Sequence, residues 1–375
     1  MRHWLLFGVV LFGCSGGQAE LDPATPAGMQ SLCDAGDSAA CARLGLKLYR
    51  GEGVPVDLAR AAELLERGCS GNQVYACGEL GNMVRHGEGA KKDLARAAVL
   101  LTGACKSGHM PSCTRAGILF ASGEGVPVDE VQAARFYQAA CNDGDTRACS
   151  NLAMLYSEGN AITHDDHRAV QLWTQACDLN YGPACASLGN MFERGAGVEK
   201  AESRAMALYM KACETLGTGS GCFLLALAAD RGAGARPDHV RALQYFNRAC
   251  EKSHAIACHY AAIAYEQGSG TSEDEVKSLE LYEKSCDLGH APACLRAAQL
   301  YAAGKGTPFA TGWHYLEKAC AAKSWIACVK LGNALRTGDR ELPADAERSR
   351  VLLQKACDAG ETLGCAAAPK APEHK

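Results

Sequence analysis

The sequence is poor in aromatic residues and in long apolar runs. Phe, Trp and Tyr make up 6% of it, so few large side chains can stabilise a fold by burial. Beyond the N-terminal segment, no run approaches the roughly 18 consecutive apolar residues of a membrane-spanning helix, and we expect a soluble folded body. The formal net charge of −4 argues against a nucleic-acid partner.

The motifs of common metal sites and serine-nucleophile sites are also missing. There is no Cys-x2-Cys pair of the kind that binds zinc, and no serine has a lysine three residues later, as serine β-lactamases do. The nearest metal candidate is the run from His164 to His167, where Asp165 also suits a helix N-cap, and we expect a solvated loop there. We therefore predict no metal, no cofactor and no assignable catalytic residue.

What the sequence has in abundance is cysteine. Twenty of its 21 cysteines form ten pairs, nine of them separated by seven residues and the sixth by eight, and the pairs recur about every 36 residues. A fixed period of this size predicts a solenoid, in which each unit packs on its neighbours. The pairs are Cys33 and Cys41, Cys69 and Cys77, Cys105 and Cys113, Cys141 and Cys149, Cys177 and Cys185, Cys213 and Cys222, Cys250 and Cys258, Cys286 and Cys294, Cys320 and Cys328, and Cys357 and Cys365.

These cysteines are better explained by disulfides than by metal, because the N-terminus has the layout of an export signal. Links within a repeat, such as Cys41 to Cys69, would leave Cys33 and Cys365 unpaired, whereas links across the turn use all twenty. We therefore predict ten local bridges. Each closes a loop of about nine residues and contributes roughly 2.5 kcal/mol in the chain-entropy model.

Each repeat predicts two helices. Counted from the second cysteine of a pair, apolar or small residues at offsets 3, 4, 6 and 7 cover one face of a first helix, the A helix. Glycine at offset 10 ends it as a left-handed C-cap. A second helix, the B helix, begins after an N-cap aspartate in seven repeats. These are Asp57, Asp93, Asp129, Asp165, Asp238, Asp274 and Asp345.

The N-terminal segment predicts export. Residues 1–13 hold one arginine and an apolar stretch, which is the layout of a signal peptide. The sequence from Leu11 to Cys14 resembles the lipobox of bacterial lipoproteins, which implies lipidation of Cys14 and favours the outer membrane. The alternative is an ordinary signal cleaved nearby, which would leave a periplasmic or secreted protein. We expect a flexible tether over residues 14–29, the repeat array over 30–368 and a disordered tail over 369–375.

The repeat consensus A-C-x-x-L-G-x-x-Y-x-x-G-x-G-V-x-x-D-x-x-R-A resembles the Sel1-like repeat, a relative of the tetratricopeptide repeat. The resemblance covers about residues 30–365 and implies an all-α fold, a right-handed α-solenoid of about nine helix-turn-helix repeats. The added cysteine pairs make the chain similar to secreted cysteine-rich Sel1-like proteins, some of which are described as penicillin-binding proteins or weak β-lactamases.

These observations favour a binding scaffold over an enzyme. A solenoid offers a continuous groove, and A-helix offsets 2, 5 and 9 should line it. Candidate contacts are Asn82, Asn190 and Asn333, and the apolar Leu224, Leu227, Tyr260 and Ile263. The asparagines could instead be tolerated exposed residues, and the apolar residues could pack on adjacent helices. We predict a monomeric scaffold that binds an envelope protein or peptide; the alternative is a β-lactamase-like hydrolase without Ser-x-x-Lys.

Overall fold

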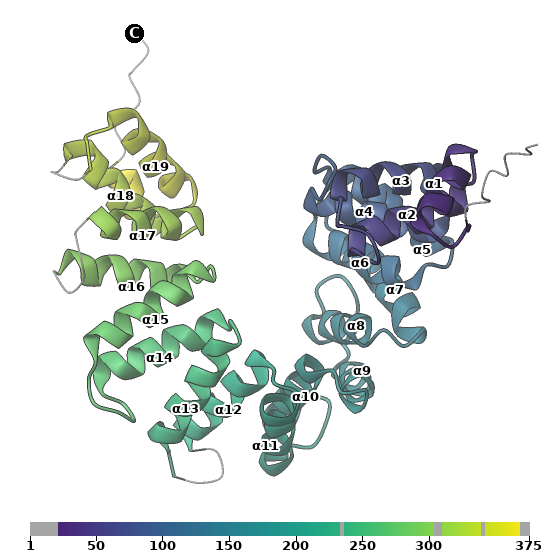
Figure 1. Ribbon diagram of the computed structural model, residues 1–375. Coiled ribbons are helices and arrows are strands. Elements are labelled where there is room, and N and C mark those ends of the chain that lie inside the picture. The colour runs from purple at the N-terminus through teal and green to yellow at the C-terminus, as the bar shows by residue number, and fades with distance from the viewer. Residues whose placement is uncertain (1–21, 233–235, 304–309, 339–341, 368–375) are drawn as a thin grey trace, which may run out of the picture. The chain divides into compact units, whose positions relative to one another are not determined.

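The computed structural model describes residues 22–232, 236–303, 310–338 and 342–367, which fall into two compact units. Unit 1 comprises residues up to 148 together with 160–162, and unit 2 comprises 149–159 and the residues from 163 onward. Every regular element in the described ranges is helical, and within each unit successive helices pack side by side (Figure 1). The predicted all-α repeat fold is confirmed.

The helices follow the predicted alternation of A and B helices. Unit 1 holds α1 (Pro26–Asp34), α2 (Ser38–Arg50), α3 (Leu58–Ser70), α4 (Val74–His86), α5 (Leu94–Lys106), α6 (Met110–Ser122) and α7 (Glu130–Asn142). Next along the chain comes α8 (Thr146–Glu158). Unit 2 continues with α9 (Asp166–Asp178), α10 (Gly182–Arg194), α11 (Glu202–Met210), the π-helix η1 (Lys211–Thr215), α12 (Gly219–Arg231), α13 (His239–Glu251), α14 (Ala255–Gln267), α15 (Glu275–Asp287), α16 (Ala291–Ala302), α17 (Ala310–Ala321), α18 (Trp325–Thr337), α19 (Ala346–Asp358) and α20 (Thr362–Ala367).

The helices begin and end where the sequence indicates. All seven predicted N-cap aspartates accept a hydrogen bond, at 2.8–2.9 Å, from the backbone N–H three residues later. At the other end, the offset-10 glycines of the described A helices have φ between 65° and 78°, which favours glycine. Gly338 differs from the left-handed C-caps because its ψ is 163°. Gly304 lies outside the described residues.

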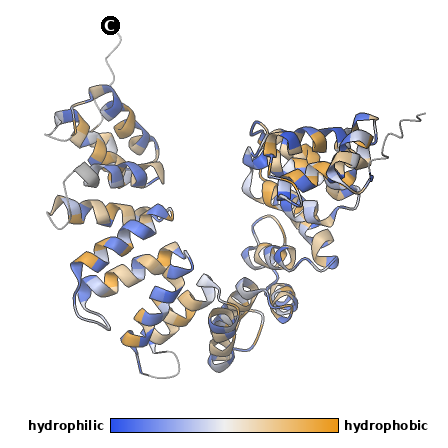
Figure 2. Ribbon diagram, in the orientation of Figure 1, coloured by the Kyte–Doolittle hydropathy of each residue, from blue (hydrophilic) through white to orange (hydrophobic). Residues whose placement is uncertain are grey.

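Glycine at offset 4 of the A helix has a different role, which is close packing. A Cβ atom on Gly117 would lie 2.5 Å from the ring of Tyr137, and one on Gly189 would lie 2.6 Å from the ring of Tyr209. Both tyrosines are buried, at the same position of their B helices. The Leu-Gly signature therefore lets an A helix approach the B helix of its own repeat. Figure 2 shows hydrophobic residues interspersed with hydrophilic ones along these helices.

The predicted local disulfides are confirmed for nine pairs, in each of which both cysteines belong to the same unit. Their Cα atoms are 4.4–4.7 Å apart, and each bridge joins the last turn of one helix to the first turn of the next. Cys141 and Cys149 are disulfide cysteines as well. So many disulfides indicate an oxidising compartment outside the cytoplasm.

The wider sixth pair is accommodated by a local change of helix type. Cys213 lies in η1, the π-helix that continues α11, and is bonded to Cys222 nine residues later. A single π turn absorbs one inserted residue without ending the helix. The extra residue therefore leaves the disulfide in place, with a Cα–Cα distance of 4.4 Å.

The first helix begins earlier than we expected. Pro26 opens α1, and the hydroxyl of Thr25 accepts a hydrogen bond from Gly28 N, so residues 26–29 are helical rather than part of a tether. Proline is well tolerated in the first turn because its missing N–H has no partner there. Met29 and Cys33 are buried against α2 and α3, which holds the helix in place. The predicted signal, Cys14 and the tail over 369–375 lie outside the described residues.

Candidate protein-binding surface

The predicted apolar residues lie on two successive A helices of unit 2, α12 and α14, but they differ in exposure. Leu224, Leu227 and Ile263 are half-buried and pack against the core of this unit. Tyr260 is 39% exposed. Packing on adjacent helices therefore applies to Leu224, Leu227 and Ile263. Tyr260 is exposed and is the residue best placed to contact a partner.

Tyr260 is held by an aromatic cluster. Its ring centroid lies 5.3 Å from that of Phe246, which is buried, and 5.7 Å from that of Phe223. Phe223 in turn stacks on His254, at 4.7 Å between centroids, and burial lowers the pKa of that imidazole. Ile256, 41% exposed, lies one helical turn before Tyr260. The cluster presents a rigid aromatic side chain beside an exposed aliphatic one.

The three predicted asparagines are less available than the sequence suggested. Burial raises the pKa of Tyr49 and of Tyr209, and the neighbouring amides of Asn82 and Asn190, respectively, act in the opposite direction. The amide oxygen of Asn333 is buried and has no hydrogen-bond partner among the described residues. Two of the amides therefore lie beside the protein's own tyrosines, which the sequence pattern did not reveal.

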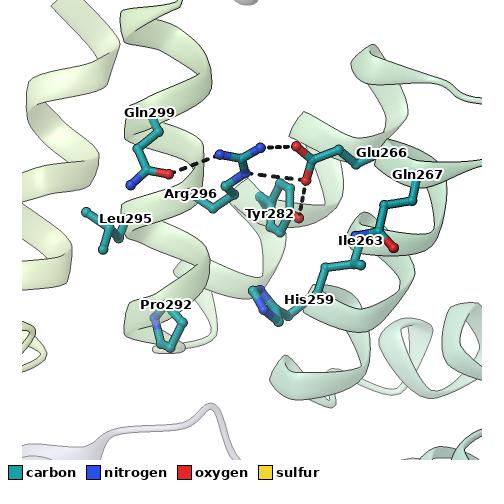
Figure 3. A pocket seen from close by; sticks show the side chains of 9 residues that line it. All are labelled: His259, Ile263, Glu266, Gln267, Tyr282, Pro292, Leu295, Arg296 and Gln299. Atoms are coloured by element: carbon teal, nitrogen blue, oxygen red, sulfur yellow. Dashed lines mark hydrogen bonds and ion pairs between the residues drawn. The ribbon is translucent and has the colours of Figure 1, made fainter.

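A pocket of about 600 Å³ opens between the A helices α14 and α16 (Figure 3). We call it the α14/α16 pocket. Ile263, Leu295 and Pro292 form apolar walls, and the buried Tyr282 reaches it from the B helix α15. His259 connects it to the aromatic cluster, because its ring centroid is 6.2 Å from that of Tyr260. Cluster and pocket are therefore adjacent on α14.

The charges of the pocket are paired with one another. Arg296 donates to both carboxylate oxygens of Glu266, one of them through Nε at 3.3 Å, and to Gln299 Oε1 at 3.1 Å. The hydroxyl of Tyr282 donates to Glu266 at 2.7 Å. Burial and then the hydrogen bond to Glu266 raise the pKa of Tyr282, and the same carboxylate raises the pKa of Arg296. Tyr282 therefore keeps its proton at neutral pH and donates it in a hydrogen bond to Glu266.

His259 adds a neutral imidazole to this wall. Burial, and secondarily the nearby His290, lowers its pKa to about 4. The two imidazole centroids are 4.9 Å apart, and His259 Nδ1 has no hydrogen-bond partner in the described structure. At neutral pH the ring therefore contributes polar contact surface without charge.

Sequence reasoning named one residue of this pocket, Ile263, which lies at offset 5. It missed Glu266 and Tyr282, because they fall at offsets 8 and 24 rather than 2, 5 or 9. A signal was nevertheless present. Glutamate and tyrosine recur 16 residues apart in an earlier repeat, where the hydroxyl of Tyr209 donates to Glu193 at 2.7 Å, and Arg231 pairs with that carboxylate too. A search for pairs repeated between repeats would have found it.

Two other structural features bear on function. His164 lies 3.3 Å from Asp166 and Asp165 caps α9, and across the described ranges no group of three or more potential ligands is placed to hold a metal ion. Within those ranges no helix is both long and apolar enough to cross a bilayer.

Stacked helix pairs with an open, partly apolar surface define an α-solenoid repeat protein. The Sel1 repeat family model matches nine consecutive segments of the chain: 38–73, 74–109, 111–145, 146–181, 182–214, 219–254, 255–290, 291–324 and 325–361. The protein therefore belongs to the Sel1 repeat family, whose members generally act as scaffolds for protein–protein interaction.

Two solved structures share this fold over most of this chain. A Sel1 repeat protein from Oxalobacter formigenes is 25% identical with a TM-score of 0.59, over 84% of this chain and 90% of its own. A protective antigen of uropathogenic Escherichia coli strains is 24% identical with a TM-score of 0.55, over 90% of this chain and 72% of its own. Cysteine rich protein B of Helicobacter pylori is 29% identical with a TM-score of 0.30, over 36% of this chain and 96% of its own. No curated protein matches the sequence significantly.

Proposed function

We propose that this protein is a scaffold of the bacterial cell envelope that binds a protein or peptide partner on the A-helix surface of unit 2, from α12 to α16. The observation that carries the proposal is the exposed Tyr260, fixed by Phe223 and Phe246 beside the α14/α16 pocket. Rigid aromatic side chains next to a pocket are typical of interface hot spots, because little conformational entropy is lost when they bind.

Tyr260→Ala tests this proposal. Peptides selected from a random library on the oxidised protein should bind the variant about thirtyfold more weakly, the usual loss for an aromatic hot spot. Val276→Ala is the matched control, since Val276 is an exposed apolar residue of the B helix α15. Circular dichroism melts establish that both variants fold. Equal peptide affinities for wild type and Tyr260→Ala would refute the proposed surface.

Leu224→Asp is a poorer test. Leu224 packs against the buried core of unit 2, so a carboxylate there would cost several kcal/mol by losing its solvation. The expected outcome is loss of folding rather than a selective loss of binding.

The envelope location includes a lipid anchor at Cys14. The disulfides support export, and the lipobox-like Leu11 to Cys14 supports acylation of this cysteine. Cys14→Ala, expressed in a Gram-negative host, should move the protein from the membrane fraction to the soluble periplasmic fraction, as measured by fractionation and intact mass. Persistence of the variant in the membrane fraction would rule out the anchor. The hydrolase alternative rests on the family resemblance alone.

A further inference from the structure

We propose that the α14/α16 pocket selects one uncharged apolar side chain of an extended peptide. This rests on the proposed function and assigns a chemical class to one position of the partner. The pocket combines aliphatic walls with an ion pair that is already satisfied.

The ion pair is what excludes charged side chains. Arg296 engages both oxygens of Glu266, whose side chain is 22% exposed. A carboxylate from a partner would have to draw Arg296 away and leave a half-buried Glu266 with fewer hydrogen bonds. A partner's ammonium group would have to lose its hydration beside Arg296. We expect both changes to have a net cost, because the mostly buried Glu266 would lose a charged hydrogen-bond partner, while Arg296, which is 41% exposed, keeps part of its hydration.

The walls favour an apolar occupant. Ile263, Leu295 and Pro292 contribute aliphatic surface, and the ring of Tyr282 contributes aromatic surface. An entering leucine or phenylalanine would remove apolar area from water on its own side and on the pocket's side. The volume of about 600 Å³ is within the range of pockets that hold small ligands, so any natural side chain fits.

The rim supplies hydrogen bonds for a peptide backbone. Gln299 uses its carbonyl oxygen to accept from Arg296, which leaves its amide NH2 group as a donor. Gln267, at the end of α14, is exposed and lines the pocket from the other A helix (Figure 3). Carboxamides on two facing helices match the alternating carbonyl and N–H groups of an extended chain, which a purely hydrocarbon ligand lacks.

The test uses three peptides, Ala-Thr-X-Thr-Ala, acetylated and amidated at their ends, with leucine, glutamate or lysine as X. Binding to the oxidised full chain is followed by the NMR methyl signals of Ile263 and Leu295. The leucine peptide should shift both signals saturably, and the glutamate and lysine peptides should bind at least about tenfold more weakly, a difference of roughly 1.4 kcal/mol.

A change of pocket charge gives a second readout. Glu266→Gln leaves Arg296 without its anion while keeping an oxygen for Tyr282, so the glutamate peptide should bind this variant at least about tenfold more tightly than it binds wild type. The leucine peptide should change little. Glu280→Gln removes the same charge from the exposed face of α15, outside the pocket, and should leave all three affinities unchanged.

The possible outcomes separate the two proposals. Charge selection is wrong if the glutamate peptide binds wild type as tightly as the leucine peptide, or if Glu266→Gln leaves the preference unaltered. If none of the three peptides moves the methyl signals while library peptides still require Tyr260, only the pocket assignment fails. If, in addition, library peptides bind Tyr260→Ala as tightly as wild type, both the pocket assignment and the proposed function fail.

Discussion

Reduction of the disulfides should unfold this protein at room temperature. Each local bridge closes a loop of about nine residues and contributes roughly 2.5 kcal/mol in the chain-entropy model, whereas a folded domain has a net stability of only about 5–15 kcal/mol. Several such links therefore account for most of the available stability. Far-ultraviolet circular dichroism before and after dithiothreitol, with a thiol count to establish full reduction, measures the effect.

Removal of a single bridge tests the size of each contribution. Cys250→Ala combined with Cys258→Ala should lower the free energy of unfolding by about 2 kcal/mol, because both cysteines are buried and alanine leaves no unpaired thiol. The effect should stay within neighbouring repeats, as expected for a solenoid. A fully reduced protein with unchanged helicity and melting temperature would show that helix packing alone holds the fold.

Gly117→Ala should destabilise the protein by about 1–2 kcal/mol, although alanine is the better helix former. A Cβ atom at this position would lie 2.5 Å from the ring of Tyr137, which is 3% exposed and cannot move into solvent without opening the core. The A and B helices of the repeat must therefore separate. Chemical denaturation monitored by circular dichroism gives the change in unfolding free energy.

Gly103→Ala is the matched control. Gly103 lies in α5 of the same unit and is exposed. A Cβ atom added there would have no neighbouring side chain or other helix within 4 Å. There alanine should stabilise the protein by about 0.5–1 kcal/mol, since only helix propensity changes. If both substitutions stabilised the protein, the proposed close contact between A and B helices would be incorrect.

Repeat architecture was predictable because its signals are local. An aspartate such as Asp238 caps a helix through a backbone N–H three residues away, and a glycine such as Gly268 ends one through its own φ. Each of these signals is weak alone, but because they recur in most repeats, together they predict the helix boundaries. The disulfide pairing followed in the same way, because a link between residues eight apart needs only one turn between two helices.

The candidate site was predictable only in part, because exposure depends on neighbouring repeats. Leu224 and Tyr260 occupy the same offset, yet Leu224 packs on the core and Tyr260 is held outward by Phe223 and Phe246. A helical wheel assigns both to one face but does not include the side chains of the next helix. Asn190 was misjudged for a similar reason, since the neighbouring Tyr209 lies on the following B helix.

The sequence by itself determined the helical repeat, its caps and its cysteine pairs, because each depends on residues within about one repeat of one another. Only the tertiary structure decided where an open pocket forms and which charged side chains pair with one another inside it. Glu266, Tyr282 and Arg296 come from three different helices, α14, α15 and α16. Their mutual hydrogen bonds depend on the distances between stacked helices, and side-chain packing sets those distances.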